Sequence, residues 1–158
     1  MSETIFLKLT RIVKLLLLLL FTLLIIDVTW QVLSRYVLKT PSTFTEELSR
    51  YLLIWLTLLA TAYSRSYRGQ MAIDYFYQKF SEKNQRFLSI GIECCILLFT
   101  LGVFIIGGSY LVYITFYMEQ KSSTLQLPMG VVYSIIPISG LLILWYTVYH
   151  LNQLFTSK

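Results

Sequence analysis

Charged residues are scarce in this sequence of 158 residues, where they make up 13%, whereas soluble domains carry about 25%. A chain with so few charges cannot cover a water-facing surface. It is long enough for one small bundle of helices and too short to add a soluble domain. The basic residues behind its net charge of +5 flank apolar stretches, so we expect no nucleic-acid partner.

Residues that catalyse reactions or bind metals are also few. His150 is the only histidine, which excludes a cytochrome b with paired axial histidines. Cys94 and Cys95 are neighbours, so they cannot form a disulfide of normal geometry, and no second cysteine pair could complete a metal site. The sequence also has no Cys-x-x-Cys loop, no glycine-rich phosphate loop and no Ser-His-Asp set. We therefore expect no enzyme activity, no metal and no cofactor in this chain.

Long apolar stretches are what the sequence has instead. A helix needs about 20 mostly apolar residues to cross the hydrocarbon core of a bilayer, which is ~30 Å thick. Four stretches reach that length, namely residues 15–38, 44–63, 87–117 and 129–155. We predict an all-α membrane protein with a single domain, residues 1–158. Its four transmembrane helices should span about residues 11–38, 44–66, 82–118 and 128–155.

The distribution of lysine and arginine predicts the orientation of these helices. If the N-terminus is cytoplasmic, that side receives nine basic residues, namely Lys8, Arg11, Lys14, Arg65, Arg68, Lys79, Lys83, Arg86 and Lys158. The outer side then receives four, namely Arg35, Lys39, Arg50 and Lys121. Because cytoplasmic loops carry the excess of basic residues, we predict that both termini are cytoplasmic (N-in/C-in).

A short amphipathic segment separates the second and third apolar stretches. After Gly69, four apolar or aromatic residues fall at helical spacing on one face, namely Ile73, Phe76, Tyr77 and Phe80. A helix of this kind can lie in the plane of the membrane interface with its aromatic side among the acyl chains. A plain loop is the alternative, but it would expose this apolar surface. We therefore expect an interfacial helix over about residues 70–80.

Prolines and glycines predict where the spanning helices end or bend. Pro41 stops the first helix, and Thr43 with Glu46 has the spacing of a capping box for the second. The third helix would be about 55 Å long at 1.5 Å per residue, so it must tilt, bend or protrude. A bend or close helix contact is expected at its glycines, namely Gly102, Gly107 and Gly108. Pro137 should kink the fourth helix, because it cannot donate to the carbonyl of Tyr133.

Two acidic residues lie inside the predicted spans. Asp27 is near the middle of the first helix, and Glu93 lies about two turns into the third. An ionised carboxylate in this position is costly unless it is paired or hydrated. The two acids could form a proton relay. Because no transport motif accompanies them, we favour buried polar contacts between helices.

Four charged residues gather at the outer end of the first two helices. They are Arg35, Glu46, Glu47 and Arg50. Arg50 is three residues after Glu47 and four after Glu46, and both spacings allow an ion pair on a helix. These charges could anchor the helices at the headgroups, or they could form a surface for a partner protein.

Two segments, residues 27–36 (DVTWQVLSRY) and 41–51 (PSTFTEELSRY), form a recognisable pattern, of which the EELSR block is the most specific part. This pattern resembles the small membrane subunit of TRAP transporters (tripartite ATP-independent periplasmic transporters, the DctQ or Q-type subunit). Further matches are residues 68–74 (RGQMAID), 127–129 (LPM) and 133–137 (YSIIP). Gln70 departs from the pattern, because the family often has histidine at this position.

This resemblance implies a partner and a cargo. Such subunits lie in the bacterial inner membrane beside a large M-type subunit, which holds the sodium and substrate sites. A periplasmic binding protein delivers an organic acid, with sialic acid the first candidate and C4-dicarboxylates the next. The small subunit would brace the large one, which agrees with the lack of inverted repeats and broken half-helices in this sequence. The four outer charges would then contact the large subunit or the binding protein, and residues 119–127 are a second candidate contact.

A stand-alone exporter is the alternative interpretation. A dimeric, proton-coupled exporter would explain Asp27 directly, because the carboxylate could bind protons and cations in turn. It explains the long third helix, the interfacial segment and the outer charges less well. Purification separates the two hypotheses, because a brace should come out with a much larger membrane protein, whereas an exporter should be active alone.

Overall fold

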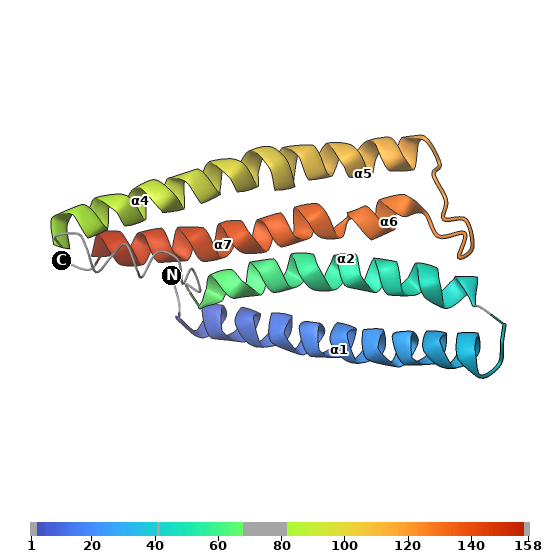
Figure 1. Ribbon diagram of the computed structural model, residues 1–158. Helices are drawn as coiled ribbons and strands as arrows, with labels where there is room; N and C mark the ends of the chain where they lie inside the picture. Colours follow the sequence, from blue (N-terminus) through green and yellow to red (C-terminus); the bar gives the residue numbers. More distant parts are fainter. Residues whose placement is uncertain (1–2, 41, 68–81, 157–158) are drawn as a thin grey trace.

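The computed structural model describes residues 3–40, 42–67 and 82–156. Within these ranges the chain is helical, and the only β-structure is an isolated bridge between Lys121 and Pro128. The helices, labelled as in Figure 1, are α1 (Glu3–Tyr36), α2 (Thr43–Ser66), α4 (Glu82–Phe99), the π-helix η1 (Thr100–Gly107), α5 (Gly108–Tyr117), α6 (Met129–Tyr133) and α7 (Ile135–Thr156). The segments α4, η1 and α5 form one continuous rod, and Ser134 alone separates α6 from α7.

The helices lie side by side in one layer, in the order α1, α2, α6–α7 and α4–η1–α5 (Figure 1). Helix α2 contacts α1 on one side and α7 on the other, and α7 in turn contacts η1 and α4. At the end where α1 begins, side chains also reach beyond the nearest helix, from α1 to α7 and from α2 to α4. Lipid tails are as apolar as leucine, so no hydrophobic force closes a bundle around apolar side chains.

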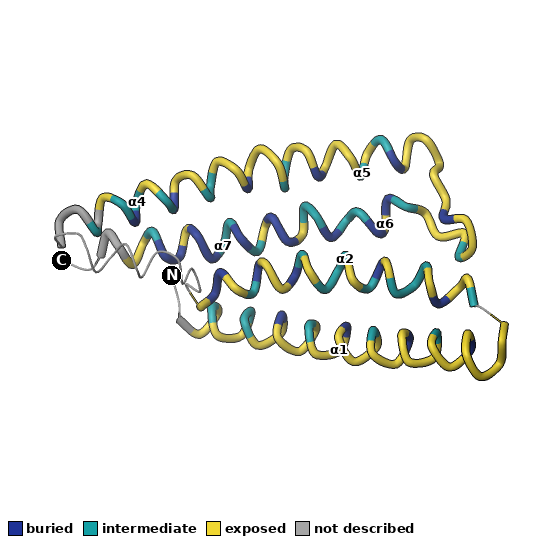
Figure 2. The backbone as a smooth tube through the Cα atoms, in the orientation of Figure 1, coloured by how far each residue is buried: buried dark blue, intermediate teal, exposed yellow. Residues whose placement is uncertain are grey.

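Burial follows this layered arrangement. Buried residues concentrate on α7 and on one side of α2, whereas α1 and the α4–η1–α5 rod are largely exposed (Figure 2). The small core at the centre of the layer joins Leu20 of α1, Leu59 of α2 and Ile135 of α7. The exposed side chains of the two outer rods include many large apolar ones. Apolar surface of this extent must be covered by lipid or by another membrane protein.

Two glycines let α7 approach the neighbouring rod closely. A Cβ added to Gly140 would lie 2.7 Å from the Cβ of Phe104, and one added to Gly108 would lie 2.7 Å from Cγ2 of Ile136. Small residues at such crossings allow the helix backbones to pack tightly in a membrane. Gly108 therefore makes the close contact expected from the sequence, whereas Gly102 faces open space.

Both of the contacting rods are irregular where they meet. The α4–η1–α5 rod contains the π-helix η1, and the α6–α7 rod is interrupted at Ser134. This interruption lies in the turn before Pro137, whose missing N–H leaves the carbonyl of Tyr133 without its helical donor. Next to this break, the indole Nε1 of Trp55 on α2 donates to the carbonyl of Val132 at 3.1 Å. Membrane helices tolerate such breaks where a neighbour satisfies the backbone.

Trp55→Phe tests what the bond from Trp55 to Val132 contributes to stability. The change keeps an aromatic ring but removes the donor to Val132, and an unsatisfied buried group costs about 1–3 kcal/mol. We expect a loss of about 1–2 kcal/mol in the free energy of unfolding, measured by denaturant titration in detergent. Trp145→Phe is the matched control, because Nε1 of Trp145 is buried with no hydrogen-bond partner among the described residues. Equal losses from the two variants would contradict this role of Trp55.

The helix ends differ in detail from the sequence expectations. Helix α1 begins at Glu3, well before the expected start near residue 11. Helix α2 begins at Thr43, and its N-cap is Ser42, whose hydroxyl accepts from the amide of Thr45 at 3.5 Å. The cap is therefore one residue earlier than the expected Thr43, because the serine has the extended backbone that a capping side chain needs.

Three helical stretches are long and apolar enough to cross a membrane, namely Thr4–Tyr36, Phe87–Tyr117 and Met129–Gln153. Helix α2 is not among them, and it carries charged residues near both ends, namely Glu46, Glu47, Arg50 and Arg65. A fourth span therefore stays a prediction. The interfacial helix expected at 70–80, with Ile73, Phe76, Tyr77 and Phe80, lies outside the described residues.

Candidate functional site

A first polar cluster lies at the hairpin end of the layer, where α1 connects to α2 and α5 connects to α6 (Figure 1). Its centre is Glu47, in the second turn of α2. Oε2 of Glu47 accepts from the backbone amides of Thr124 and Leu125, each at 3.0 Å, and Oε1 accepts from the Tyr51 hydroxyl at 2.7 Å. The Tyr51 oxygen also lies 3.3 Å from Sδ of Met129. Glu47 thus fastens the α5–α6 connection to α2.

The connection that Glu47 holds, residues 118–128, has a defined backbone. The Ser122 amide donates to the Leu127 carbonyl at 2.9 Å, and residues Glu119 and Gln126 have left-handed φ angles of 48° and 54°. Such angles cost non-glycine residues about 1–2 kcal/mol, and they persist where the surrounding contacts fix the backbone. The bonds within the loop and from Glu47 provide those contacts.

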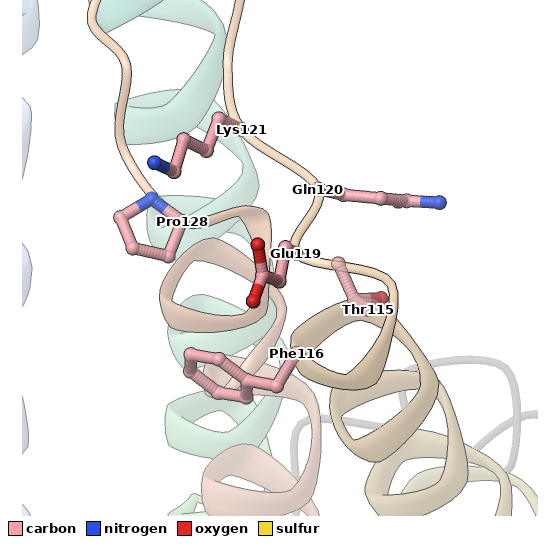
Figure 3. A pocket seen from close by; sticks show the side chains of 6 residues that line it. All are labelled: Thr115, Phe116, Glu119, Gln120, Lys121 and Pro128. Atoms are coloured by element: carbon pink, nitrogen blue, oxygen red, sulfur yellow. The ribbon is translucent and has the colours of Figure 1, made fainter.

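A cavity of about 320 Å³ lies between this loop and the ends of α5 and α6 (Figure 3). It is lined by Thr115, Phe116, Glu119, Gln120, Lys121 and Pro128. The side chains of Glu119 and Lys121 extend toward the side of Phe116 and Pro128, whereas Gln120 points away (Figure 3). The cavity therefore combines an acid and a base with an apolar wall.

A second polar cluster lies at the opposite end of the layer, where both termini are found (Figure 1). Nη2 of Arg65 on α2 makes an ion pair with Oε2 of Glu93 on α4, and it also donates to the Thr147 hydroxyl of α7 at 3.4 Å. His150 of α7 contacts the Arg65 carbonyl through Nε2 at 2.9 Å. All four residues are buried. This cluster joins three helices with charges and hydrogen bonds.

Aromatic side chains cover this second cluster on the α1 side. The ring of Phe6 stacks on Tyr149 with centroids 4.3 Å apart and meets Tyr146 edge-on at 5.5 Å. The Thr10 hydroxyl lies 3.3 Å from that of Tyr146. The first turns of α1 therefore reach α7, which fixes α1 at this end of the layer in addition to its packing on α2.

The structure places the remaining predicted residues as follows. Arg35, Glu46 and Arg50 are exposed, and none of them forms an ion pair within the described ranges. Asp27 is 8% exposed on the side of α1 that packs on α2, and its Oδ2 has no hydrogen-bond partner among described residues. Glu93, by contrast, is paired with Arg65. The two acids lie in separate environments, and no contact joins them within the described part.

Sequence reasoning missed the contacts of three residues that matter most. It treated Arg65 as one of the cytoplasmic charges and His150 as a solitary histidine, and it did not connect Glu47 with residues 124–125. A usable signal was available for Arg65, because it and Glu93 are opposite charges at similar depth in spans that the sequence predicts one after the other. For Glu47 we find no such signal, because its partners are backbone amides.

Comparison with known families identifies the chain. Residues 24–157 match the sequence model of the family described as "Tripartite ATP-independent periplasmic transporters, DctQ component". The chain belongs to this DctQ family. It is therefore a membrane component of a transporter and a multi-pass protein of the bacterial inner membrane, in agreement with its apolar helices. Both polar clusters lie within the matched range, apart from the contacts of Phe6 and Thr10.

Two relatives of this DctQ-family chain have names that describe their transport systems. The "Sialic acid TRAP transporter small permease protein SiaQ" of Vibrio cholerae serotype O1 is 26% identical over 113 residues, which are 68% of this chain and 65% of that protein. The "Isethionate TRAP transporter permease protein DctMQ" of Oleidesulfovibrio alaskensis is 27% identical over 119 residues, which are 71% of this chain and 18% of that protein. The match thus spans less than two thirds of the length of either relative.

Proposed function

We propose that this chain is the small scaffold subunit of a sodium-coupled TRAP transporter that imports an organic acid. Its family membership carries the first part of this proposal. Its partners would be a large M-type membrane subunit, with the sodium and substrate sites, and a periplasmic binding protein. The match to a short part of a much longer permease named DctMQ supports the association of Q-type and M-type parts.

The open layer of helices supports the role of a brace. A transporter subunit that moves its cargo between its own helices is typically built from paired half-helices that line a site near the middle of the membrane. The described residues of this chain form instead a single layer whose outer rods expose apolar side chains. Such a layer would extend the fixed part of a larger membrane protein and increase its contact with lipid.

Helix α2 would be the fourth transmembrane helix. It has 24 residues, which give about 36 Å at 1.5 Å per residue and so suffice for the hydrocarbon core. It also packs between α1 and α7, and both α1 and the α6–α7 rod are long and apolar enough to span, so α2 lies at their depth. With four spans, the bias of basic residues favours cytoplasmic termini. The Glu47 cluster would then be periplasmic and the Arg65 cluster cytoplasmic.

The cargo proposal rests on the names of the relatives. One relative is named for sialic acid and the other for isethionate, and both compounds are organic acids. We place sialic acid first for this chain and C4-dicarboxylates next. Among the outer charges, Arg35, Glu46 and Arg50 are exposed and suited to contact the partner subunits, whereas Glu47 holds the chain's own loop.

Co-purification and reconstituted uptake test this function. A tag on this chain should retain a large membrane protein encoded beside it. Vesicles with both proteins should take up radiolabelled sialic acid only when the binding protein and an inward sodium gradient are present. Uptake by the large protein alone at the full rate would overturn the scaffold role, and uptake of dicarboxylates alone would correct the cargo.

The same vesicles test the alternative, a dimeric proton-coupled exporter. Its supporting observation is the buried Oδ2 of Asp27, which has no hydrogen-bond partner among the residues that the structure describes. Vesicles with this chain alone should show no proton-driven efflux, and Asp27→Asn should leave uptake by the complete complex within about twofold, equivalent to ~0.4 kcal/mol. Efflux by the chain alone that is lost in Asp27→Asn would replace the scaffold proposal.

A further inference from the structure

The loop of residues 118–128 is built more firmly than a simple connection between two helices requires. It carries the Lys121–Pro128 bridge, and the amide of Met129 donates to the carbonyl of Gln120 at 2.9 Å. Glu119, the second residue after α5, has a left-handed backbone. A short connection between antiparallel helices can be made without such features. This construction indicates a surface that must keep its shape.

Glu47 fixes this loop from outside. Both bonds to Oε2 come from consecutive amides, those of Thr124 and Leu125, and the Tyr51 hydroxyl holds the other carboxylate oxygen. Hydrogen bonds to an ionised acceptor are about twice as strong as neutral ones. The loop therefore stays in one conformation before any partner binds, which reduces the entropy lost on binding.

The cavity in the loop gives this surface its chemistry. Glu119 and Lys121 carry opposite charges, and Phe116 and Pro128 form the apolar wall beside them (Figure 3). A lipid surface would match a single sign of charge together with apolar side chains. An acid and a base beside an apolar wall instead match a protein surface that presents the complementary base and acid.

We infer that this cavity is a preformed docking site for a folded soluble protein, with Glu47 as its positioning residue. The partner places a basic side chain beside Glu119 and an acidic one beside Lys121. In the transporter proposed above, on which this inference rests, the partner is the binding protein that delivers the cargo.

The test uses the complete complex of both membrane subunits in vesicles, with the purified binding protein outside at increasing concentration. Lys121→Glu and Glu119→Lys should each raise the apparent KM for the binding protein about tenfold, equivalent to 1.4 kcal/mol. The maximal rate should not change, because the transport steps lie in the large subunit. Ser123→Lys is the matched control, since Ser123 is exposed on the same loop and does not line the cavity.

Glu47→Gln separates positioning from direct contact. The neutral amide accepts more weakly, so the amides of Thr124 and Leu125 should exchange with solvent about tenfold faster, and the apparent KM should rise as for Lys121→Glu. An unchanged KM in both cavity variants, or an equal rise in Ser123→Lys, would overturn the docking site. Faster exchange without a rise in KM would overturn the positioning role. Failure of the scaffold proposal is distinguishable, because the wild-type chain would then not purify with the large subunit at all.

Discussion

Arg65→Met should lower the free energy of unfolding by about 3–5 kcal/mol, because it leaves the carboxylate of Glu93 buried without its partner. The ion pair joins α2 to α4 and is buried on both sides. Glu93→Leu should cost more than Arg65→Met. A carboxyl group that has lost its partner can take up a proton, whereas a guanidinium group stays charged. Denaturant titration in mixed micelles would measure both losses.

The double variant Arg65→Met/Glu93→Leu tests whether the pair itself is the cause. Replacing a buried ion pair with apolar residues of similar size is often neutral or stabilising by about 1–4 kcal/mol. We therefore expect the double variant to be more stable than either single variant. Losses that simply add would show that each side chain acts through other contacts. Thr147 and His150, which also contact Arg65, would then be the first candidates.

Gly140→Val should separate α7 from the α4–η1–α5 rod. The new Cβ would lie 2.7 Å from the Cβ of Phe104, an atom that cannot move away by side-chain rotation. Inserting side-chain atoms into a tight contact costs about 1–3 kcal/mol and occasionally more, and we expect about 3 kcal/mol here. Denaturant titration in mixed micelles would measure this loss in the free energy of unfolding. In addition, less of the large subunit should co-purify with the variant, because the layer of helices changes shape.

Gly91→Val is the matched control for this prediction. Gly91 lies on α4 of the same rod, and a Cβ added there meets nothing within 4 Å in the described part of the chain. We expect a change of less than about 0.5 kcal/mol, which is usual for surface substitutions. If both valine variants were equally unstable, the cause would be the loss of glycine and not the close contact of the helices.

The helices themselves could be predicted from local sequence features. The length of an apolar stretch is compared with the thickness of the bilayer, and this comparison needs no knowledge of neighbouring helices. It predicted the positions of α1, α4–η1–α5 and α6–α7, which the structure has with shifts at the ends. The family resemblance, based mainly on the segment that includes Glu46 and Glu47, agrees with the family match.

The two polar clusters could not be predicted in the same way. Arg65 and Glu93 are 28 residues apart, and Glu47 is 77 residues from the amide of Thr124. Such contacts depend on the order of the helices in the layer and on the rotation of each helix about its axis. The π-helix η1 changes that rotation in the α4–η1–α5 rod. The sequence predicted a bend or a close contact near the glycines of this rod, but it did not predict the π-helix.

The sequence by itself determined that this is an apolar, all-helical chain of the DctQ type, with few groups for chemistry of its own. Lengths of apolar stretches and short motifs are local properties, and each can be recognised without a structure. Only the tertiary structure decided that the helices form an open layer, that Glu47 holds a distant loop and that Arg65 neutralises Glu93. The physical reason is that, between apolar helices in a membrane, small residues and a few polar contacts select one packing among many of similar energy.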